Sequence, residues 1–289
     1  MSAQHRKTVL ITGCSSGIGR AAARLFQQQG WQVAATQRNP AAEAELNRLP
    51  GVICPRLDVT DPASIQSAVA ETIAAFGRID VVVNNAGYAL MGAFETHSEA
   101  QVRRQFETNV FGLMEVCRGV LPHLRGQRAG TLINVASMVG RIPLPLYSVY
   151  NASKFAVEGF SEGLVYELEE FGVQVKLIEP GAVKTNFFGR SSDRANGTGE
   201  TAYAHYTAEQ LSVMDDIGAC GSESEDAAAV IWAAANDSSR RMRYSVGTDA
   251  KALLFVRRLL PDATFQRMIR LSLSRMAFNS VGRLLYKQA

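Results

Sequence analysis

Short apolar runs alternate along this chain with longer segments in which apolar residues recur every three or four positions. The short runs are typical of strands buried on both faces of a sheet, and the longer segments are typical of amphipathic helices. Strands and helices in alternation, joined by short turns, predict an α/β fold with a doubly wound parallel sheet. The expected strands span 7–12, 31–36, 52–57, 79–83, 131–135, 173–178 and 243–246.

Recognisable end signals accompany the expected helices. Asp61 followed by Pro62 is a good helix start, because an aspartate side chain can cap the first turn and proline is tolerated there. Ser98 is expected to cap the helix after the fourth strand, and Ser222 or Ser224 is expected near the cap of the alanine-rich helix. The expected helices span 20–29, 62–76, 99–121, 147–171 and 222–236.

Two stretches depart from this alternation. Segment 186–221 is rich in Ser, Gly, Asn, Thr and Asp and is longer than ordinary connections, so we expect a substrate-covering segment with short helical pieces. The tail 249–289 has the pattern of two arginine-rich amphipathic helices split at Pro261. Such a tail can pack on the core or a partner subunit, or it can form a basic surface that touches a membrane or covers a lipophilic substrate cleft. The chain is thus expected to form one domain over 1–248 with a helical extension over 249–289.

Composition narrows the class of protein. The chain has 289 residues, of which 47% are hydrophobic, enough to bury a full core as a single domain. The net charge of only +3 argues against a nucleic-acid-binding surface. The four cysteines form no CxxC pair and the four histidines match no metal spacing, so we expect reduced thiols and no metal site.

The compartment is expected to be the cytoplasm. The chain reaches its first strand within a few residues, which leaves no room for a signal peptide. No apolar run approaches the roughly 20 residues of a membrane span.

The first strand leads directly into a glycine-rich turn, TGCSSGIG, and then into a helix. Glycines at 13, 17 and 19 let backbone amides approach a pyrophosphate, whose charge the helix N-terminus favours. A glycine turn can also merely connect two elements, but the strand before it and the helix after it favour nucleotide binding.

The second strand ends in Gln37 and Arg38. An acidic residue is expected near this point when the cofactor is NAD, and none is present. Arg38 is suited to clamp a ribose 2′-phosphate, although a solvated arginine opening a loop is the alternative. We therefore expect NADP(H) to be preferred, with NAD(H) possible.

A serine, a tyrosine and a lysine follow the fifth expected strand. Ser137 lies just past the strand end, at the edge where open α/β sheets bind ligands. Tyr150 and Lys154 are four residues apart in a helix, so the ammonium is expected beside the phenol. A nearby cation lowers the pKa of a phenol, so Tyr150 could exchange a proton with a carbonyl or alcohol oxygen that Ser137 holds. The alternative is an ordinary contact on a helix surface.

Polar residues also follow the third and fourth strands. Asp58 ends the third strand, and Asn85 stands in the turn after the fourth, where its side chain is expected to lock the strand ends together. Asn109 lies inside a helix that faces the sheet, and a buried polar residue there needs partners. It is expected to hold a water on a route from Lys154 to solvent, or to be a satisfied core asparagine.

Six features occur in a fixed order: TGCSSGIG, NNAG, Asn109, Ser137, YNASK and PGAVKT. Together they resemble the short-chain dehydrogenase/reductase family over roughly residues 7–247. The resemblance implies a Rossmann fold and a catalytic tetrad of Asn109, Ser137, Tyr150 and Lys154. It places Asp58 against adenine, 85–87 against the nicotinamide and Thr185 on its carboxamide. The residues expected to contact the cofactor are Gly13, Ser15, Ser16, Gly17, Ile18, Gly19, Arg38, Asp58, Val59, Asn85, Ala86, Gly87, Tyr150, Lys154, Pro180, Gly181, Val183 and Thr185.

The activity implied is hydride transfer between NADP(H) and a carbonyl or alcohol, as in dehydrogenases acting on CH–OH groups. Within the family the chain looks most like the branch of 17β-hydroxysteroid dehydrogenase type 1, retinol dehydrogenases and bacterial NADP-dependent aldehyde reductases. Some NADP-using members carry a basic residue in the glycine turn, where this chain has Ser15 and Ser16. The preference for NADP(H) therefore rests on Arg38 and the absent acid. The apolar character of Leu144, Leu146, Phe187 and Phe188 near the expected cleft suggests a lipophilic ketone, aldehyde, steroid or retinoid. The expected substrate contacts are Ser137, Leu144, Tyr150, Phe187 and Phe188, of which the apolar ones could equally be core residues.

Two other functions stay open. A catalytically silent NADP-binding regulator is one, since fold does not fix function. A membrane-attached enzyme, held by the C-terminal helices, is the other. Family resemblance further implies a homodimer or homotetramer built by the helices that carry Asn109 and Tyr150.

Overall fold

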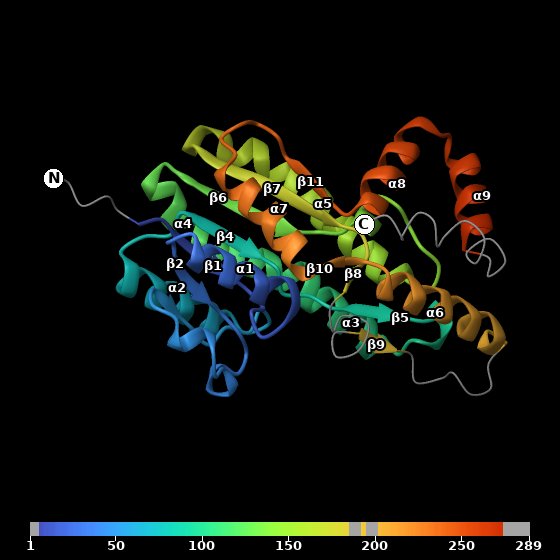
Figure 1. Ribbon diagram of the computed structural model, residues 1–289, viewed down its shortest axis with the longest axis horizontal. Coiled ribbons are helices and arrows are strands. Elements are labelled where there is room, and N and C mark those ends of the chain that lie inside the picture. The colour runs from blue at the N-terminus through green and yellow to red at the C-terminus, as the bar shows by residue number, and fades with distance from the viewer. Residues whose placement is uncertain (1–5, 185–191, 195–201, 274–289) are drawn as a thin grey trace.

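The computed structural model describes residues 6–184, 192–194 and 202–273 and is organised around a seven-stranded parallel sheet (Figure 1). The strand order is β11-β7-β6-β4-β1-β2-β3, and each neighbouring pair is parallel. The order reverses between β1 and β4, which is the point where such sheets bind ligands. The predicted doubly wound sheet is confirmed. Its strands are β1 (Thr8–Ile11), β2 (Gln32–Ala35), β3 (Val52–Ile53), β4 (Val81–Asn84), β6 (Gly130–Val135), β7 (Val173–Pro180) and β11 (Arg243–Val246).

Helices cover both faces of the sheet because successive residues of each strand point to opposite sides. In β1, Val9 and Ile11 pack in one apolar cluster with Phe26, while Leu10 packs in a second cluster with Leu124. Fully burying such side chains stabilises a fold by about 1.5–3 kcal/mol each. The first cluster lies under α1 (Gly17–Gln28) and α7 (Ser224–Asn236); the second lies under α2 (Pro62–Phe76), α4 (Gly112–Gln127) and α5 (Ser148–Leu168).

Two helix starts follow the expected side-chain chemistry and a third differs in its capping residue. The Asp61 carboxylate accepts hydrogen bonds from the first turn of α2, and Ser98 forms a capping box with Gln101 at the start of α3 (Glu99–Phe106). At α7 the serines expected near the cap flank it, but the cap itself is Glu223, which forms a box with Asp226. The serines are not available there: Ser222 pairs as a strand with Val183, and α7 already begins at Ser224.

The predicted third strand, 52–57, is too long. Proline at position 55 has no N–H to donate to a ladder, so pairing stops after Ile53. A single bridge between Gln37 and Arg56 continues the line of the strand. The long helix predicted over 147–171 also ends early, since α5 stops at Leu168 and a 3-10 turn follows.

The segment expected to hold only short helical pieces contains a full helix, α6 (Ala204–Ala219), which corrects that prediction. Residues Ser192–Arg194 form β9, which pairs with β5 (Ala89–Met91), and Ser222–Glu223 form β10, which pairs with β8 (Val183–Lys184). Thr185, Phe187 and Phe188 lie outside the described residues, so their predicted contacts stay predictions.

The tail forms α8 (Thr248–Leu259) and α9 (Asp262–Ser272), split at Pro261 as predicted. Leu254 and Phe265 join a third apolar cluster with Tyr147 and Met214, so the described part of the tail packs on the core. Figure 1 shows α6, α8 and α9 grouped beyond the sheet, at the right of the view.

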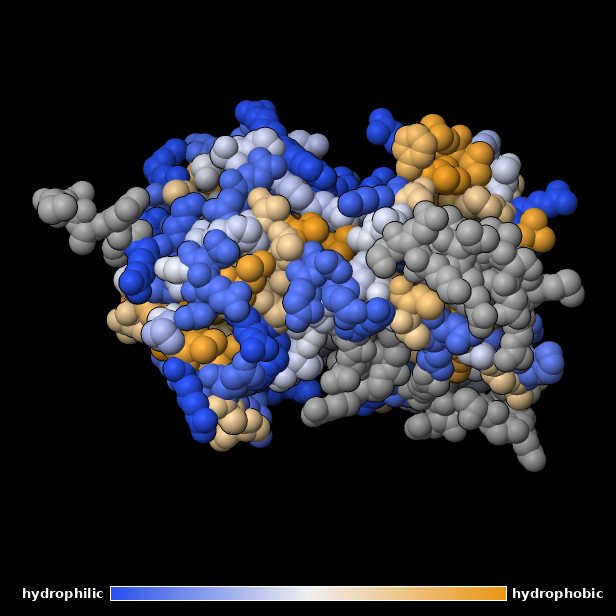
Figure 2. Space-filling model, in the orientation of Figure 1, coloured by the Kyte–Doolittle hydropathy of each residue, from blue (hydrophilic) through white to orange (hydrophobic). Residues whose placement is uncertain are grey.

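Apolar side chains also lie on the outside of the tail. Phe255 and Leu259 of α8 are 64% and 63% exposed, and Figure 2 shows hydrophobic atoms gathered over this helix. Among the described residues, none of the helices has the length and apolarity that crossing a bilayer requires. Membrane contact through the tail stays a prediction.

Candidate active site

A cavity of about 600 Å³ lies at the carboxyl ends of the parallel strands. Turns that follow β1, β2, β3, β4, β6 and β7 all contribute to its wall, because parallel strands end at one edge. Of the predicted cofactor residues within the described chain, Gly19 alone does not line it. The residues that do are Gly13, Ser15, Ser16, Gly17, Ile18, Arg38, Asp58, Val59, Asn85, Ala86, Gly87, Tyr150, Lys154, Pro180, Gly181 and Val183.

The glycine turn forms a cradle of bare backbone. Gly13 and Gly17 adopt positive φ angles of 75° and 56°, which glycine adopts at little cost. A Cβ on Gly19 would lie 2.5 Å from the Gly13 carbonyl oxygen and 2.4 Å from Asn85 Nδ2, so the packing requires glycine. The Ser16 side chain does not cap α1, and the first turn carries no acidic residue. Its N–H groups therefore suit an anion such as a pyrophosphate.

Asn85 joins the ends of β1 and β4. Its Nδ2 donates to the carbonyl oxygens of Thr12 (2.9 Å) and Gly13 (3.2 Å), and its backbone N–H donates to Thr12 Oγ1 at 3.0 Å. The predicted locking of the strand ends is confirmed. These bonds hold the glycine turn against the turn that contains Ala86.

The far end of the cavity carries a cation and an unusual buried amide. Arg38 is exposed at the rim and has no carboxylate partner among the described residues. Gln37 is 4% exposed and lines the same wall, yet its Nε2 is buried without a hydrogen-bond partner in the described part of the chain. An unpaired guanidinium and an unpaired amide donor fit the phosphate and hydroxyl oxygens of an adenosine cofactor. The sequence interpretation missed Gln37, although it stands where an acid was sought.

Ser137, Tyr150 and Lys154 all line this cavity. Ser137 follows β6 and begins a 3-10 turn, and its hydroxyl donates to the Pro180 carbonyl oxygen at 3.3 Å. The same side chain is hydrogen-bonded to the Tyr150 phenol, on the first turn of α5. Lys154 lies one turn further along α5. Its Nζ donates a hydrogen bond to the Val135 carbonyl oxygen at 2.8 Å and lies 5.8 Å from the centre of the Tyr150 ring.

The prediction of a lowered Tyr150 pKa is wrong for this arrangement, in which the pKa is raised. Burial raises the pKa of the phenol, nearby Tyr147 raises it further, and the Ser137 hydrogen bond opposes both. Burial is the largest of these effects, because a buried phenolate loses its water. Burial also lowers the pKa of Lys154, to about 8, while the Glu158 carboxylate opposes that change. Tyr150 is therefore a neutral phenol at pH 7.

Asn109 lies in a π-helical turn, Glu107–Phe111, between α3 and α4. Its Oδ1 accepts from the Tyr88 N–H at 3.1 Å, and its Nδ2 donates to the Tyr88 carbonyl oxygen at 2.9 Å. The sequence left open whether Asn109 holds a water or is a core asparagine with its own hydrogen-bond partners. These contacts fit the second alternative, because the protein backbone pairs with its side-chain amide. Asn109 fixes the turn after β4, and π-helical turns often mark functional positions.

Comparison with known proteins identifies the family. Residues 7–196 match the short chain dehydrogenase family. This chain belongs to the short-chain dehydrogenase/reductase family. The sheet, the cavity at its carboxyl edge and the order of the motifs agree with that assignment.

Three of its relatives carry informative names. A 3-ketodihydrosphingosine reductase of Bacteroides thetaiotaomicron is 41% identical over 179 residues, which cover 62% of this chain and 65% of that protein. The structure of a family member from Burkholderia phymatum in complex with NAD is similar, with a TM-score of 0.77, 28% identity and coverage of 90% of this chain and 94% of that one. The structure of ElxO with NADP bound has a TM-score of 0.69 and 26% identity, and the match covers 83% of this chain and 97% of that one.

Such relatives make this chain an oxidoreductase with a site for a nicotinamide cofactor. One of the two structures holds NAD and the other NADP. The regulator alternative finds no support in them. Among the described residues, no group of three or more His, Cys, Asp or Glu side chains is arranged to hold a metal ion.

The sequence interpretation largely missed the wall of the cavity that lies away from the glycine turn. Leu144 does line it, as predicted, but Met214 and Ile217 of α6 form much of the apolar wall, together with Met138 and Tyr147. A polar wall stands beside it, formed by Tyr88, Arg104 and Asp193. Arg104 of α3 pairs with Asp193 of β9, which ties the small β5–β9 sheet to α3. The apolar spacing of Leu211, Met214 and Ile217 was the available signal for this wall.

Proposed function

We propose that this protein is an NADP(H)-dependent dehydrogenase/reductase that interconverts a lipophilic carbonyl compound and its alcohol. One observation carries the proposal. The Tyr150 phenol, hydrogen-bonded to Ser137, lies in one cavity between the glycine cradle and the apolar wall of Met214 and Ile217. A carbonyl oxygen held there would meet both hydroxyl groups.

The chemistry divides between cofactor and chain. A bound nicotinamide supplies or accepts the hydride. In the reductive direction, Tyr150 gives its proton to the substrate oxygen, and Ser137 donates a second hydrogen bond to that oxygen. The buried ammonium of Lys154 then stabilises the phenolate left behind. Asn109 holds the turn that faces these residues and completes the proposed catalytic tetrad.

Preference for NADP(H) is supported by the end of β2. Arg38 is exposed and unpaired in the described chain, and Gln37 stands there with a neutral amide that does not repel a 2′-phosphate. Charge-assisted bonds from a guanidinium to a phosphate are the strongest that this wall offers. NAD(H) stays a weaker alternative.

A lipophilic substrate is supported by the wall that α6 provides. Met138, Tyr147, Met214 and Ile217 are buried apolar residues that face the same cavity as Tyr150. The relative named 3-ketodihydrosphingosine reductase acts, by its name, on a long-chain ketone. Ketones, aldehydes, steroids and retinoids with extended apolar bodies are therefore the compounds to screen.

We also propose that the protein forms a homodimer or homotetramer through α5. Phe155 and Tyr166 on its outer face are 46% and 81% exposed. Between them, Gly159 and Gly163 have open space where a Cβ would stand, which suits close packing of a second helix. Sedimentation velocity of the native chain tests this, and a monomer at micromolar concentration contradicts it.

Tyr150→Phe tests the proposed chemistry most directly. Loss of the proton donor should lower kcat by roughly 100- to 10,000-fold. The dissociation constant of NADPH should stay close to that of the parent enzyme, because the ring remains. Tyr147→Phe is the matched control: it removes a neighbouring phenol 5.8 Å away, between ring centres, and should keep most of the activity. Turnover that survives in Tyr150→Phe would refute the assignment.

A further inference from the structure

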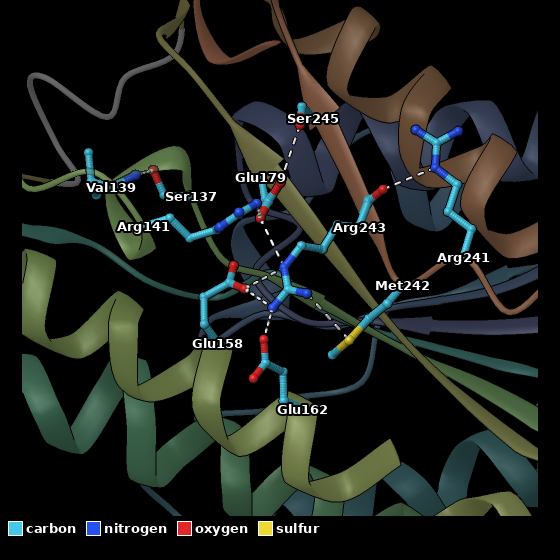
Figure 3. A network of polar contacts seen from close by, with 10 residues as sticks. All are labelled: Ser137, Val139, Arg141, Glu158, Glu162, Glu179, Arg241, Met242, Arg243 and Ser245. Atoms are coloured by element: carbon cyan, nitrogen blue, oxygen red, sulfur yellow. Dashed lines mark hydrogen bonds and ion pairs between the residues drawn. The ribbon is translucent and has the colours of Figure 1, made fainter. Parts of the chain in front are cut away.

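Figure 3 shows a cluster of charged side chains, of which Glu158, Glu179 and Arg243 lie outside the cavity wall. Glu158 of α5 is 5% exposed and Glu179, near the end of β7, is 1% exposed. Arg243 of β11 reaches between them: its Nη2 lies 3.0 Å from Glu158 Oε2, and its Nε lies 3.3 Å from Glu179 Oε1. Burying two carboxylates is costly, so a role beyond packing has to be considered.

The cluster touches the elements that hold Ser137 and Lys154. Arg141, from the loop after Ser137, lies 3.2 Å from Glu179, and Glu179 precedes the Pro180 carbonyl that accepts from Ser137. On the other side, a Cβ on Gly140 would meet the Lys154 carbonyl oxygen at 2.9 Å and Glu158 Cγ at 3.0 Å. The loop after Ser137 is thus packed against α5 between Lys154 and Glu158.

Glu158 lies on the same face of α5 as Lys154 and is buried with it. The two residues are one helical turn apart, and the Glu158 charge raises the pKa of Lys154, against the larger effect of burial. One oxygen of Glu158 is held by Arg243, while Oε1 is buried without a partner among the described residues. Burial and Glu179 raise the pKa of Glu158 to about 7, against Arg243 and Arg141. The charged groups around Glu158 are Lys154 and Glu162 on α5, Glu179 on β7, Arg141 in the loop after β6 and Arg243 on β11.

We propose that Glu158 is a positioning residue for proton transfer, which acts through Lys154: its carboxylate, anchored by Arg243, keeps the buried ammonium charged. This inference rests on the proposed function, in which Lys154 acts as a cation beside Tyr150. Arg243 and Glu179 hold Glu158 in place, and Arg141 links the same cluster to the loop of Ser137.

The pH dependence of kcat tests the proposal. Lys154 contributes as an ammonium, so activity is lost as the pH rises through its pKa. Glu158→Gln removes the supporting charge and lowers that pKa. The alkaline limb of the profile of kcat against pH should therefore move to lower pH by about one unit. Glu158→Met, a second neutral variant that leaves no amide to satisfy, should move it the same way. Glu158→Asp keeps the charge and should leave the limb near that of the parent enzyme.

Glu162→Gln is the control, because Glu162 also contacts Arg243 but lies on the exposed side of the cluster. It should leave the limb in place. If all variants lower kcat without moving the limb, Glu158 is structural only and the proposal is overturned. Tyr150→Phe distinguishes a failure of the proposed function from a failure of the role of Glu158. If Tyr150→Phe keeps its activity, the proposed function fails. If Tyr150→Phe is inactive but the Glu158 variants leave the alkaline limb of the pH profile in place, only the role of Glu158 fails.

Discussion

The two ends of the cavity are built in different ways. At the nucleotide end, the wall consists of segments that follow strands of the sheet, such as Gly13 after β1 and Asn85 after β4. At the substrate end, the wall joins α3, β9 and α6, so that Arg104 meets Asp193 across 89 positions of sequence. The first end depends on where strands stop, and the second depends on how distant segments pack.

This difference teaches where substitutions should act. A change at the nucleotide end disturbs backbone that the sheet itself fixes, and should affect every reaction of the enzyme. A change at the substrate end alters a wall of side chains, and should affect some substrates more than others. Substitutions at the two ends test this division.

Gly19→Ala should have the largest effect. Its Cβ would lie 2.5 Å from the Gly13 carbonyl oxygen, so the glycine turn has to shift. We expect NADPH affinity to fall at least about 100-fold, which corresponds to roughly 2.8 kcal/mol. Isothermal titration measures it. Gly126→Ala in α4 is the control, since a Cβ there meets nothing, and it should leave affinity unchanged.

Arg38→Ala should weaken NADPH binding and spare NADH. Loss of a charge-assisted bond costs about 1.5–3 kcal/mol, or roughly 10- to 100-fold in the dissociation constant. Protein fluorescence with each cofactor measures the change. Arg56→Ala removes an exposed arginine that pairs with Asp61 at 3.0 Å and should change neither constant. If NADH binds the parent protein as tightly as NADPH, Arg38 is a surface residue and the cofactor preference is wrong.

Met214→Ala should act on the substrate alone. Removing this side chain from the apolar wall should raise KM for a lipophilic substrate about 10-fold, or roughly 1.4 kcal/mol, with the NADPH dissociation constant unchanged. Leu124→Ala controls for stability, because it opens a comparable space in the core far from the cavity wall and should cost about 2–5 kcal/mol of folding free energy. An equal rise in KM in both variants would mean that the Met214 effect comes from loosened packing.

The same division explains how far the sequence could predict the structure. The parallel sheet, the glycine turn and the convergence of Ser137, Tyr150 and Lys154 follow from apolar runs, glycines and helical spacing, all local signals. The helix α6 and strand β9 did not follow, because polar residues around them resemble a loop and their apolar contacts lie far away in sequence. The third strand was predicted too long for a local reason, the proline at 55.

The electrostatics were the least predictable part. The pairing of Tyr150 and Lys154 was correctly expected, but the direction of the Tyr150 pKa was not. Its direction depends on burial first and on the neighbouring Tyr147 second, and no spacing rule reports either. The Gln37 amide was overlooked for the same reason, since only its enclosure makes its unpaired donor notable.

The two small parallel pairings, β5 with β9 and β8 with β10, have a consequence for how this scaffold diverges. Both are made by backbone atoms and do not depend on which side chains the paired residues carry. A segment anchored in this way can change in sequence and length between its anchor points while the seven-stranded sheet stays the same. New substrates can then be acquired by inheritance of an altered segment, without any change to the part of the enzyme that handles hydride.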